Sequence, residues 1–189
     1  DWHFDIERIK AAATDKTKVI IFSNPWNPLG IVVPLNVIRE LLAWCEERKI
    51  LLIVDQAYED YAFTPAFESA TPLVLESDWM VTAHTFSKNL AMSGWRIGYL
   101  VLPQSLNTAL AGMQDALLNC LNNTAQFAAL FSLDHPEMIE HHYKIIAYNR
   151  QRAIDLLQPL VNSGHISFKN PEGGFYIFMK TNEEDALSL

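Results

Sequence analysis

Short apolar runs alternate with amphipathic and turn-rich stretches in the first half of the chain. Continuous apolar runs rich in β-branched residues are typical of buried strands. They predict strands at residues 18–22, 50–54, 79–83 and 97–102. Apolar residues at helical spacing predict a short helix at 6–13 and a longer one at 34–49, with proline at its start and basic residues at its end. The turn formers at 23–30 and the polar stretch at 84–96 predict loops.

From residue 104 onward the pattern changes to helical spacing. Apolar residues three and four apart predict helices at 106–121, 124–133 and 136–160. Pro159 is expected to break the last of these helices. The pattern then returns to strand character at 166–169 and 174–179.

The alternation of strands and helices predicts an α/β fold, with a mostly parallel sheet and flanking helices. In such sheets, ligands bind at the carboxyl ends of the strands. Three polar segments follow predicted strand ends, namely residues 24–30, Asp55 and the loop before Lys88. We therefore expect these segments to converge on one edge of the sheet.

Composition narrows the class of protein. The chain has 14 Lys and Arg against 22 Asp and Glu, a formal charge of -8 and a pI near 5.1, which argues against nucleic-acid binding. No apolar run is long enough to span a membrane. Cys45 and Cys120 lie in apolar segments and are expected to be buried free thiols, as in a reduced cytoplasmic protein. The chain begins with Asp and stops after a strand pattern, so we expect it to be the middle of a longer protein.

Several residues could carry chemistry. Asp55 follows an apolar strand, where a carboxylate is costly unless it meets a cation or a strong donor; it either caps or pairs locally, or holds a cationic ring nitrogen. Lys88 is either a solvated charge or a Schiff-base nucleophile whose pKa is lowered by desolvation and a nearby cation. Arg96 is either a surface charge or a phosphate fork. Thr85 and Ser87 flank the lysine with hydroxyl donors.

Taken together, four ordered motifs resemble the class I/II aminotransferases, enzymes of fold type I that depend on pyridoxal 5'-phosphate (PLP). The motifs are NPWNPLG at 24–30, DQAY at 55–58, TFSK at 85–88 and GWRIG at 94–98. The segment PEGGFYIF at 171–178 is similar to a strand of the family's small domain. The resemblance implies that residues 1–140 are part of the PLP-binding large domain. It also implies that residues 141–189 comprise the interdomain helix and the beginning of the small domain.

The resemblance implies a role for each matching residue near the cofactor ring. Lys88 would form the Schiff base with PLP and later move a proton at the α-carbon of the substrate. Asp55 would keep the pyridine nitrogen protonated. Tyr58 and Asn27 would hydrogen-bond the phenolic oxygen of the ring.

The resemblance also implies a phosphate site and a partner. Arg96, with Thr85 and Ser87, would bind the cofactor phosphate. A homodimer is expected, because sites of this fold type are usually built at a dimer interface. The family's small-residue phosphate loop and ring-stacking aromatic normally precede the point where this chain begins. The arginine that grips the substrate carboxylate would follow PEGGFYIF, and no arginine occurs after Arg152.

Some positions depart from the family pattern or have a second interpretation. Leu29 stands where the family often has Thr, and Gln56 where it often has an acidic residue; neither is expected to touch the reacting atoms. Trp26 could shape the substrate pocket or pack locally. His84 is expected to be satisfied by local partners. His135, His141 and His142 fall on a predicted helix and are expected to be solvated rather than metal ligands. Four aromatic residues are core candidates: Trp44, Trp79, Phe127 and Phe131.

The leading functional hypothesis is transfer of an amino group between an amino acid and a 2-oxo acid. A carbon-sulfur β-lyase shares the lysine and phosphate motifs, and nothing in these residues separates the two. A non-catalytic aminotransferase-like module is a third possibility. Small-molecule substrates are expected, without nucleic acid or membrane partners.

Overall fold

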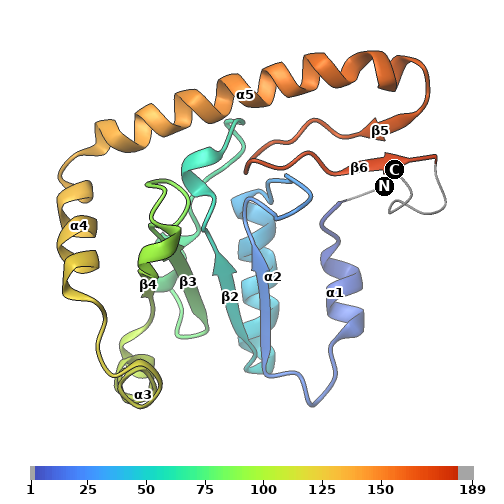
Figure 1. The fold of residues 1–189 in the computed structure, drawn as a ribbon. Coiled ribbons are helices and arrows are strands. Elements are labelled where there is room, and N and C mark those ends of the chain that lie inside the picture. Colours follow the sequence, from blue (N-terminus) through green and yellow to red (C-terminus); the bar gives the residue numbers. More distant parts are fainter. Residues whose placement is uncertain (1–2, 183–189) are drawn as a thin grey trace.

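The computed structural model describes residues 3–182 of the chain. Four strands form one sheet in the order β1-β2-β3-β4. The strands β1 (Val19–Ser23), β2 (Leu51–Asp55) and β3 (Met80–Thr85) are parallel, whereas β4 (Gly98–Val101) runs antiparallel to β3 (Figure 1). The α/β class with a mostly parallel sheet is confirmed.

Two helices in the first part of the chain have clear local causes. In α1 (Ile6–Ala12), the Asp5 side chain accepts a hydrogen bond from the Arg8 amide at the first turn. The helix α2 (Leu35–Arg48) follows Pro34 and ends at Lys49, which has a left-handed backbone. One face of α2 is buried against β2 and β3 and forms the main core with them. Its members include Ile38, Leu41, Cys45, Leu52, Val54, Leu73 and Met80.

Three short 3₁₀ turns connect the strands: η1 (Glu59–Tyr61), η2 (Thr71–Leu75) and η3 (Ser93–Trp95). The second half of the chain is helical, with α3 (Gln104–Leu118), α4 (Asn123–Leu133) and α5 (Pro136–Asn162). The long helix α5 crosses the end of the molecule where β2 points, and the pair β5 (Ile166–Phe168) and β6 (Met179–Thr181) lies beneath it (Figure 1). The second sheet is antiparallel.

Two predictions about the last segments are wrong. Pro159 lies inside α5, which continues to Asn162, because a proline in the last turn removes only one helical hydrogen bond. The strand expected at 174–179 begins only at Met179. Gly174 has a φ of +75°, and its amide donates to the Tyr61 carbonyl at 3.0 Å. The backbone therefore bends toward the large sheet before β6 starts.

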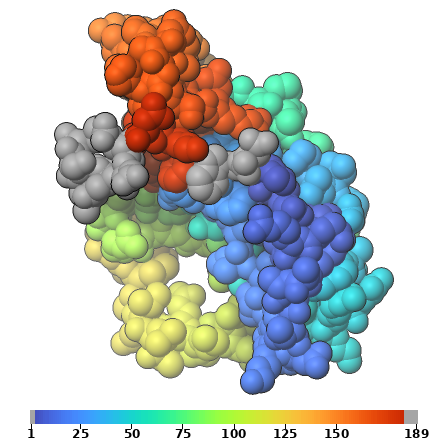
Figure 2. All heavy atoms as spheres, turned by 90° about the vertical axis from the view of Figure 1, so that its right-hand side faces the viewer, coloured from blue at the N-terminus to red at the C-terminus, as the bar shows by residue number. Residues whose placement is uncertain are grey.

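Burial also differs from the sequence predictions. Cys45 is buried, but Cys120 is exposed after α3. Phe127 and Phe131 were expected in the core, yet 74% and 58% of their surfaces are exposed. β1 is exposed on one face, at Val19 and Ile21. No residue of α3 is buried, and in α4 only Ala125, Ala129 and Ser132 are. Figure 2 shows an open gap beside this yellow segment.

Within residues 3–182, no helix has the length and apolar character needed to cross a membrane.

Candidate active site

The carboxyl ends of the parallel strands bring the three polar segments together. Asp55, the last residue of β2, pairs with Ser23 of β1 and with Ala83 of β3. The Asn24 amide donates to the Asp55 carbonyl, and the Gln56 amide donates to the Ala83 carbonyl, each at 2.8 Å. The predicted convergence on one edge of the sheet is confirmed.

Asp55 and Tyr58 belong to one tight turn after β2. The half-buried Asp55 accepts a hydrogen bond from the Ala57 amide on Oδ1 at 3.0 Å, which fixes the direction of its carboxylate. Tyr58 is buried, and its hydroxyl accepts from Asn27 Nδ2 at 3.0 Å. Burial, followed by the hydrogen bond with Tyr176, raises the pKa of the Tyr58 phenol above its ordinary value. The phenol is therefore a neutral hydrogen-bond donor across the physiological range.

Lys88 reaches the same place from the loop after β3. Its Nζ lies 5.9 Å from the ring centroids of both Tyr58 and Phe175. The Tyr61 hydroxyl donates to the Lys88 carbonyl at 2.9 Å. In helix α5, His142 donates from Nδ1 to the Asn89 carbonyl at 2.7 Å. The backbone beside the amine is thus fixed from two separate elements.

The remaining residues expected to bind the cofactor, Thr85, Ser87 and Arg96, lie in the same loop as Lys88 or at the end of β3 directly before it. The Thr85 hydroxyl donates to the Ile97 carbonyl at 3.3 Å and accepts from the Ser87 amide at 3.1 Å. Arg96 has a left-handed backbone and an exposed side chain, which donates to the Ser93 carbonyl at 2.8 Å. Because Thr85 pairs with Gly98 across the two strands, Arg96 and Lys88 leave the same edge of the sheet. Both the amine and the guanidinium therefore have access to this edge.

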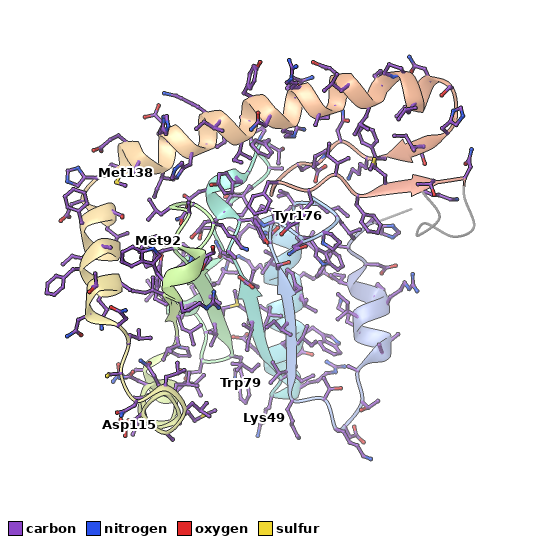
Figure 3. All side chains as sticks on the ribbon, viewed as in Figure 1. Lys49, Trp79, Met92, Asp115, Met138 and Tyr176 are labelled. Carbon is purple, nitrogen blue, oxygen red and sulfur yellow. The ribbon has the colours of Figure 1, made fainter. Side chains whose placement is uncertain are left out.

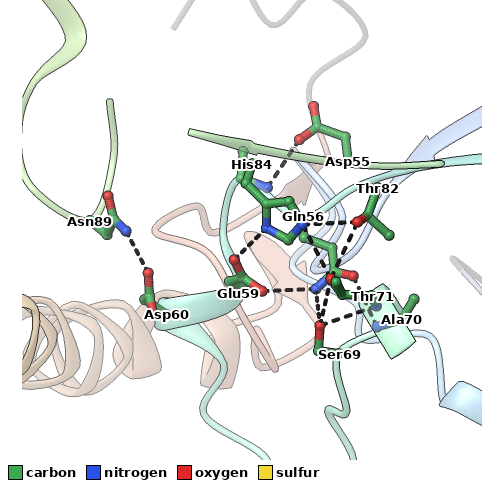
Figure 4. Close-up of polar contacts among 11 residues, drawn as sticks. Asp55, Gln56, Glu59, Asp60, Ser69, Ala70, Thr71, Thr82, His84 and Asn89 are labelled. Carbon is green, nitrogen blue, oxygen red and sulfur yellow. Dashed lines mark hydrogen bonds and ion pairs between the residues drawn. The ribbon is translucent and has the colours of Figure 1, made fainter. Parts of the chain in front are cut away.

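A network of hydrogen bonds holds the buried Gln56, within the turn at 55–58 (Figure 4). The Gln56 amide nitrogen donates to Glu59 and Ser69, each at 2.9 Å, and its oxygen accepts from the Ala70 amide at 2.9 Å. His84 bonds Glu59 through Nδ1 at 2.7 Å, which confirms the expectation of local partners. Further hydrogen bonds join His84 to Thr82 and Thr71.

The sequence motifs did not identify Phe175 and Tyr176 as neighbours of this site. The sequence feature that could have identified them is the Gly173–Gly174 pair, because two glycines permit a bend before the two aromatic residues. A Cβ at Gly173 would lie 2.5 Å from the Pro25 side chain, so only glycine fits against the loop at 24–30. Trp26, in contrast, packs its ring edge-on against Phe4 at 5.6 Å.

The fold and these side chains define an α/β protein with a candidate site around Lys88 at the carboxyl edge of its sheet. The family model for aminotransferase class I and II matches residues 1–189. The chain belongs to this family, which confirms the resemblance seen in the motifs. Enzymes of the family depend on PLP.

Two similar relatives are aspartate aminotransferase of Thermotoga maritima and aspartate/prephenate aminotransferase of Thermus thermophilus. They are 29% and 31% identical, over 95% and 94% of this chain. The matched regions make up 46% of each relative. The chain thus spans slightly less than half the length of these relatives.

Solved structures agree with the fold. The aspartate aminotransferase of Thermotoga maritima matches 96% of this chain and 47% of its own, with a TM-score of 0.85 and 28% identity. The aromatic aminotransferase of Pyrococcus horikoshii matches 94% of this chain and 48% of its own, with a TM-score of 0.83 and 26% identity.

Proposed function

We propose that the complete protein is a PLP-dependent aminotransferase, which moves an amino group between an amino acid and a 2-oxo acid. The observation that carries the proposal is the position of the Lys88 amine, which faces the rings of Tyr58 and Phe175 at 5.9 Å. Lys88 follows β3 at the edge of the sheet where the neighbouring strand, β2, ends in Asp55. An amine, a carboxylate and a buried phenol at one edge form a reactive set rather than a solvated surface.

The chemistry of the side chains fits PLP. The Lys88 amine suits its aldehyde, and the Asp55 carboxylate suits a protonated ring nitrogen. The Tyr58–Asn27 pair offers hydrogen bonds to a phenolic oxygen. At the other end of the loop, the Arg96 guanidinium and the Ser87 hydroxyl suit a phosphate group.

When bound, PLP supplies an aromatic system that accepts electrons from the substrate α-carbon. Asp55 holds the ring nitrogen in its protonated form, and the Ala57 amide keeps that carboxylate oriented. The Lys88 amine would take the proton from the substrate α-carbon and then donate it to the cofactor. Arg96 and Ser87 would hold the phosphate group of the cofactor.

The relatives guide the choice of substrates and assembly. The two relatives compared by sequence are named as aspartate and aspartate/prephenate aminotransferases, so aspartate is the first amino donor to test. A β-lyase is not favoured, because these relatives carry aminotransferase names. We further propose a cytoplasmic homodimer without nucleic-acid or membrane partners. Residues 1–140 would belong to the large domain, and 141–189 to the interdomain helix and small domain.

Borohydride trapping tests the proposal. The complete protein with PLP should show visible absorbance, and reduction should fix the cofactor to Lys88, as located by peptide mapping. Lys88→Ala should abolish the label and transamination from aspartate. Lys144→Ala, which removes an exposed lysine on α5, should leave both unchanged. Undiminished labelling of the Lys88→Ala protein would refute the assignment.

A further inference from the structure

Tyr176 lies beside the two residues that face the proposed cofactor ring oxygen. Its hydroxyl oxygen is 2.8 Å from that of Tyr58, and the two rings meet edge to face with centroids 5.7 Å apart. Asn27 Nδ2 lies 3.0 Å from the Tyr58 hydroxyl and 3.4 Å from the Tyr176 hydroxyl. Figure 3 shows Tyr176 near the carboxyl ends of the parallel strands, at the opposite end of the sheet from Lys49 and Trp79.

The segment that carries Tyr176 is fixed to the large sheet by its backbone. The Glu172 amide donates to the Gly30 carbonyl at 2.7 Å, and the Phe63 amide donates to the Glu172 carbonyl at 2.7 Å. Gly173 pairs with Ala62. These bonds join residues 172–174, which directly precede Phe175 and Tyr176, to both loops of the site.

Either phenol can be the donor in the bond between them, and the two directions have different consequences for Tyr58. The Asn27 amide nitrogen carries two hydrogens, and both phenolic oxygens lie within hydrogen-bond distance of it. Each tyrosine contributes one hydrogen. If Tyr176 donates to Tyr58, the Tyr58 hydrogen remains available for another acceptor. If Tyr58 donates to Tyr176, that hydrogen is consumed.

We propose that Tyr176 is a positioning residue that donates to Tyr58, and thereby leaves the Tyr58 hydrogen for the phenolic oxygen of bound PLP. The inference rests on the proposed function. A phenol that accepts two hydrogen bonds is polarised and becomes a stronger donor itself. Tyr176 would therefore alter the pKa of the proton shared between the phenolic oxygen of bound PLP and the nitrogen of Lys88.

The charges around Tyr58 keep its hydroxyl protonated. Besides Tyr176, the ionisable groups that face it are Asp55, from its own turn, and Lys88, from the loop after β3. Burial is the largest cause that raises the pKa of the Tyr58 phenol, and the Asp55 charge also raises this pKa, so the hydroxyl keeps its hydrogen. An ionised ring oxygen is then the strongest nearby acceptor for that hydrogen.

Tyr176→Phe tests the inference in the complete protein loaded with PLP, by titration of the visible absorbance against pH. A weaker Tyr58 bond leaves more negative charge on the phenolic oxygen, so the shared proton is retained to higher pH. The midpoint should rise by roughly 0.3 to 1 pH unit, since one neutral hydrogen bond corresponds to about one pKa unit or less. Tyr148→Phe, at an exposed tyrosine of α5, is the matched control and should not shift the midpoint.

A second comparison separates positioning from a general structural effect. Because Tyr176 acts through Tyr58, the double variant Tyr58→Phe/Tyr176→Phe should shift the midpoint no further than Tyr58→Phe alone. Additive shifts, or an unshifted Tyr176→Phe titration in a protein that still labels Lys88, would overturn this inference and leave the proposed function intact. Loss of labelling at Lys88 in the unaltered protein would instead overturn the proposed function.

Discussion

The two ends of the proposed cofactor site are held in different ways. Around Tyr58, hydrogen bonds join residues far apart in the sequence, with separations of 31 positions to Asn27 and 118 to Tyr176. Around Arg96, the bonds stay within one loop, residues 85–97. Arg96 bonds Ser93, three positions away, and Thr85 bonds Ser87, two positions away. Tyr58 is buried, whereas Arg96 is exposed.

This difference separates two tasks. The ring end needs fixed geometry, because proton transfer depends on the relative positions of an amine, a carboxylate and a phenol. Bonds between distant segments provide that geometry only in the folded chain. The phosphate end needs charge and donors, which one loop supplies by itself. We therefore expect changes at the ring end to alter rate and stability, and changes at the phosphate end to alter affinity for the cofactor.

The largest effect is expected at the ring end, from Asp55→Ala. Without the carboxylate, the ring nitrogen loses its proton and the cofactor becomes a poor electron acceptor. Loss of one partner from such a charge pair costs about 3–5 kcal/mol. The kcat/KM for aspartate should then fall about 10²- to 10⁴-fold, as measured by steady-state kinetics.

Asp15→Asn is the control for this measurement, because Asp15 is an exposed acidic residue before β1. Its kinetics should match those of the unaltered protein. If Asp55→Ala retained more than a tenth of the original kcat/KM, the carboxylate would have no role at the ring.

A smaller effect, confined to affinity, is expected from Arg96→Ala at the phosphate end. A charge-assisted hydrogen bond contributes about 1.5–3 kcal/mol, so the dissociation constant for PLP should rise about 10- to 150-fold. The urea unfolding midpoint without PLP should stay unchanged, because the guanidinium bonds only a nearby carbonyl. Arg152→Ala, at an exposed arginine of α5, should change neither quantity. An Arg96→Ala protein that lost stability without losing affinity for PLP would contradict the prediction, because Arg96 would then stabilise the fold rather than bind the cofactor.

The same contrast explains what could be predicted from the sequence. The strands, α2 and the convergence of Asp55 with the loop before Lys88 followed from apolar runs and from the geometry of parallel strands. These signals are local, and the rule that joins them is general. Contacts that depend on how a distant segment folds back gave no such signal. The bond between Tyr58 and Tyr176 is one example, because residues 174–178 have a strand-like pattern but bend over the site.

The burial predicted for residues of the helical region was wrong for another reason. Apolar spacing marks a helix face but does not specify what covers it. Phe127 and Phe131 of α4 have the expected spacing, yet both are exposed, and Cys120 is exposed as well. Cys45 has a similar apolar neighbourhood in sequence and is buried, because α2 packs on the sheet. Burial raises the pKa of the Cys45 thiol to about 11, so this thiol is unreactive near neutral pH.

The smallest effect is expected behind the ring end, from Gln56→Leu. This change removes the acceptor of the buried Ala70 amide and a donor to Glu59. A buried polar group left without a partner costs about 1–3 kcal/mol. The urea midpoint of the complete protein should therefore decrease, by an amount equivalent to that free energy. The kcat should fall as well, because Gln56 lies within the turn that orients Asp55 and Tyr58.

Gln151→Leu provides the matched control, since Gln151 is exposed on α5 and bonds Asp155 four positions away. Its unfolding midpoint should stay within the error of the unaltered protein. A stable Gln56→Leu protein with reduced kcat would mean that the network orients the turn without stabilising the fold. A Gln56→Leu protein as stable and as active as the control would show that the ring end does not depend on its bonds to distant segments, since the turn between Asp55 and Tyr58 would then keep its geometry by local bonds alone, as the phosphate end does.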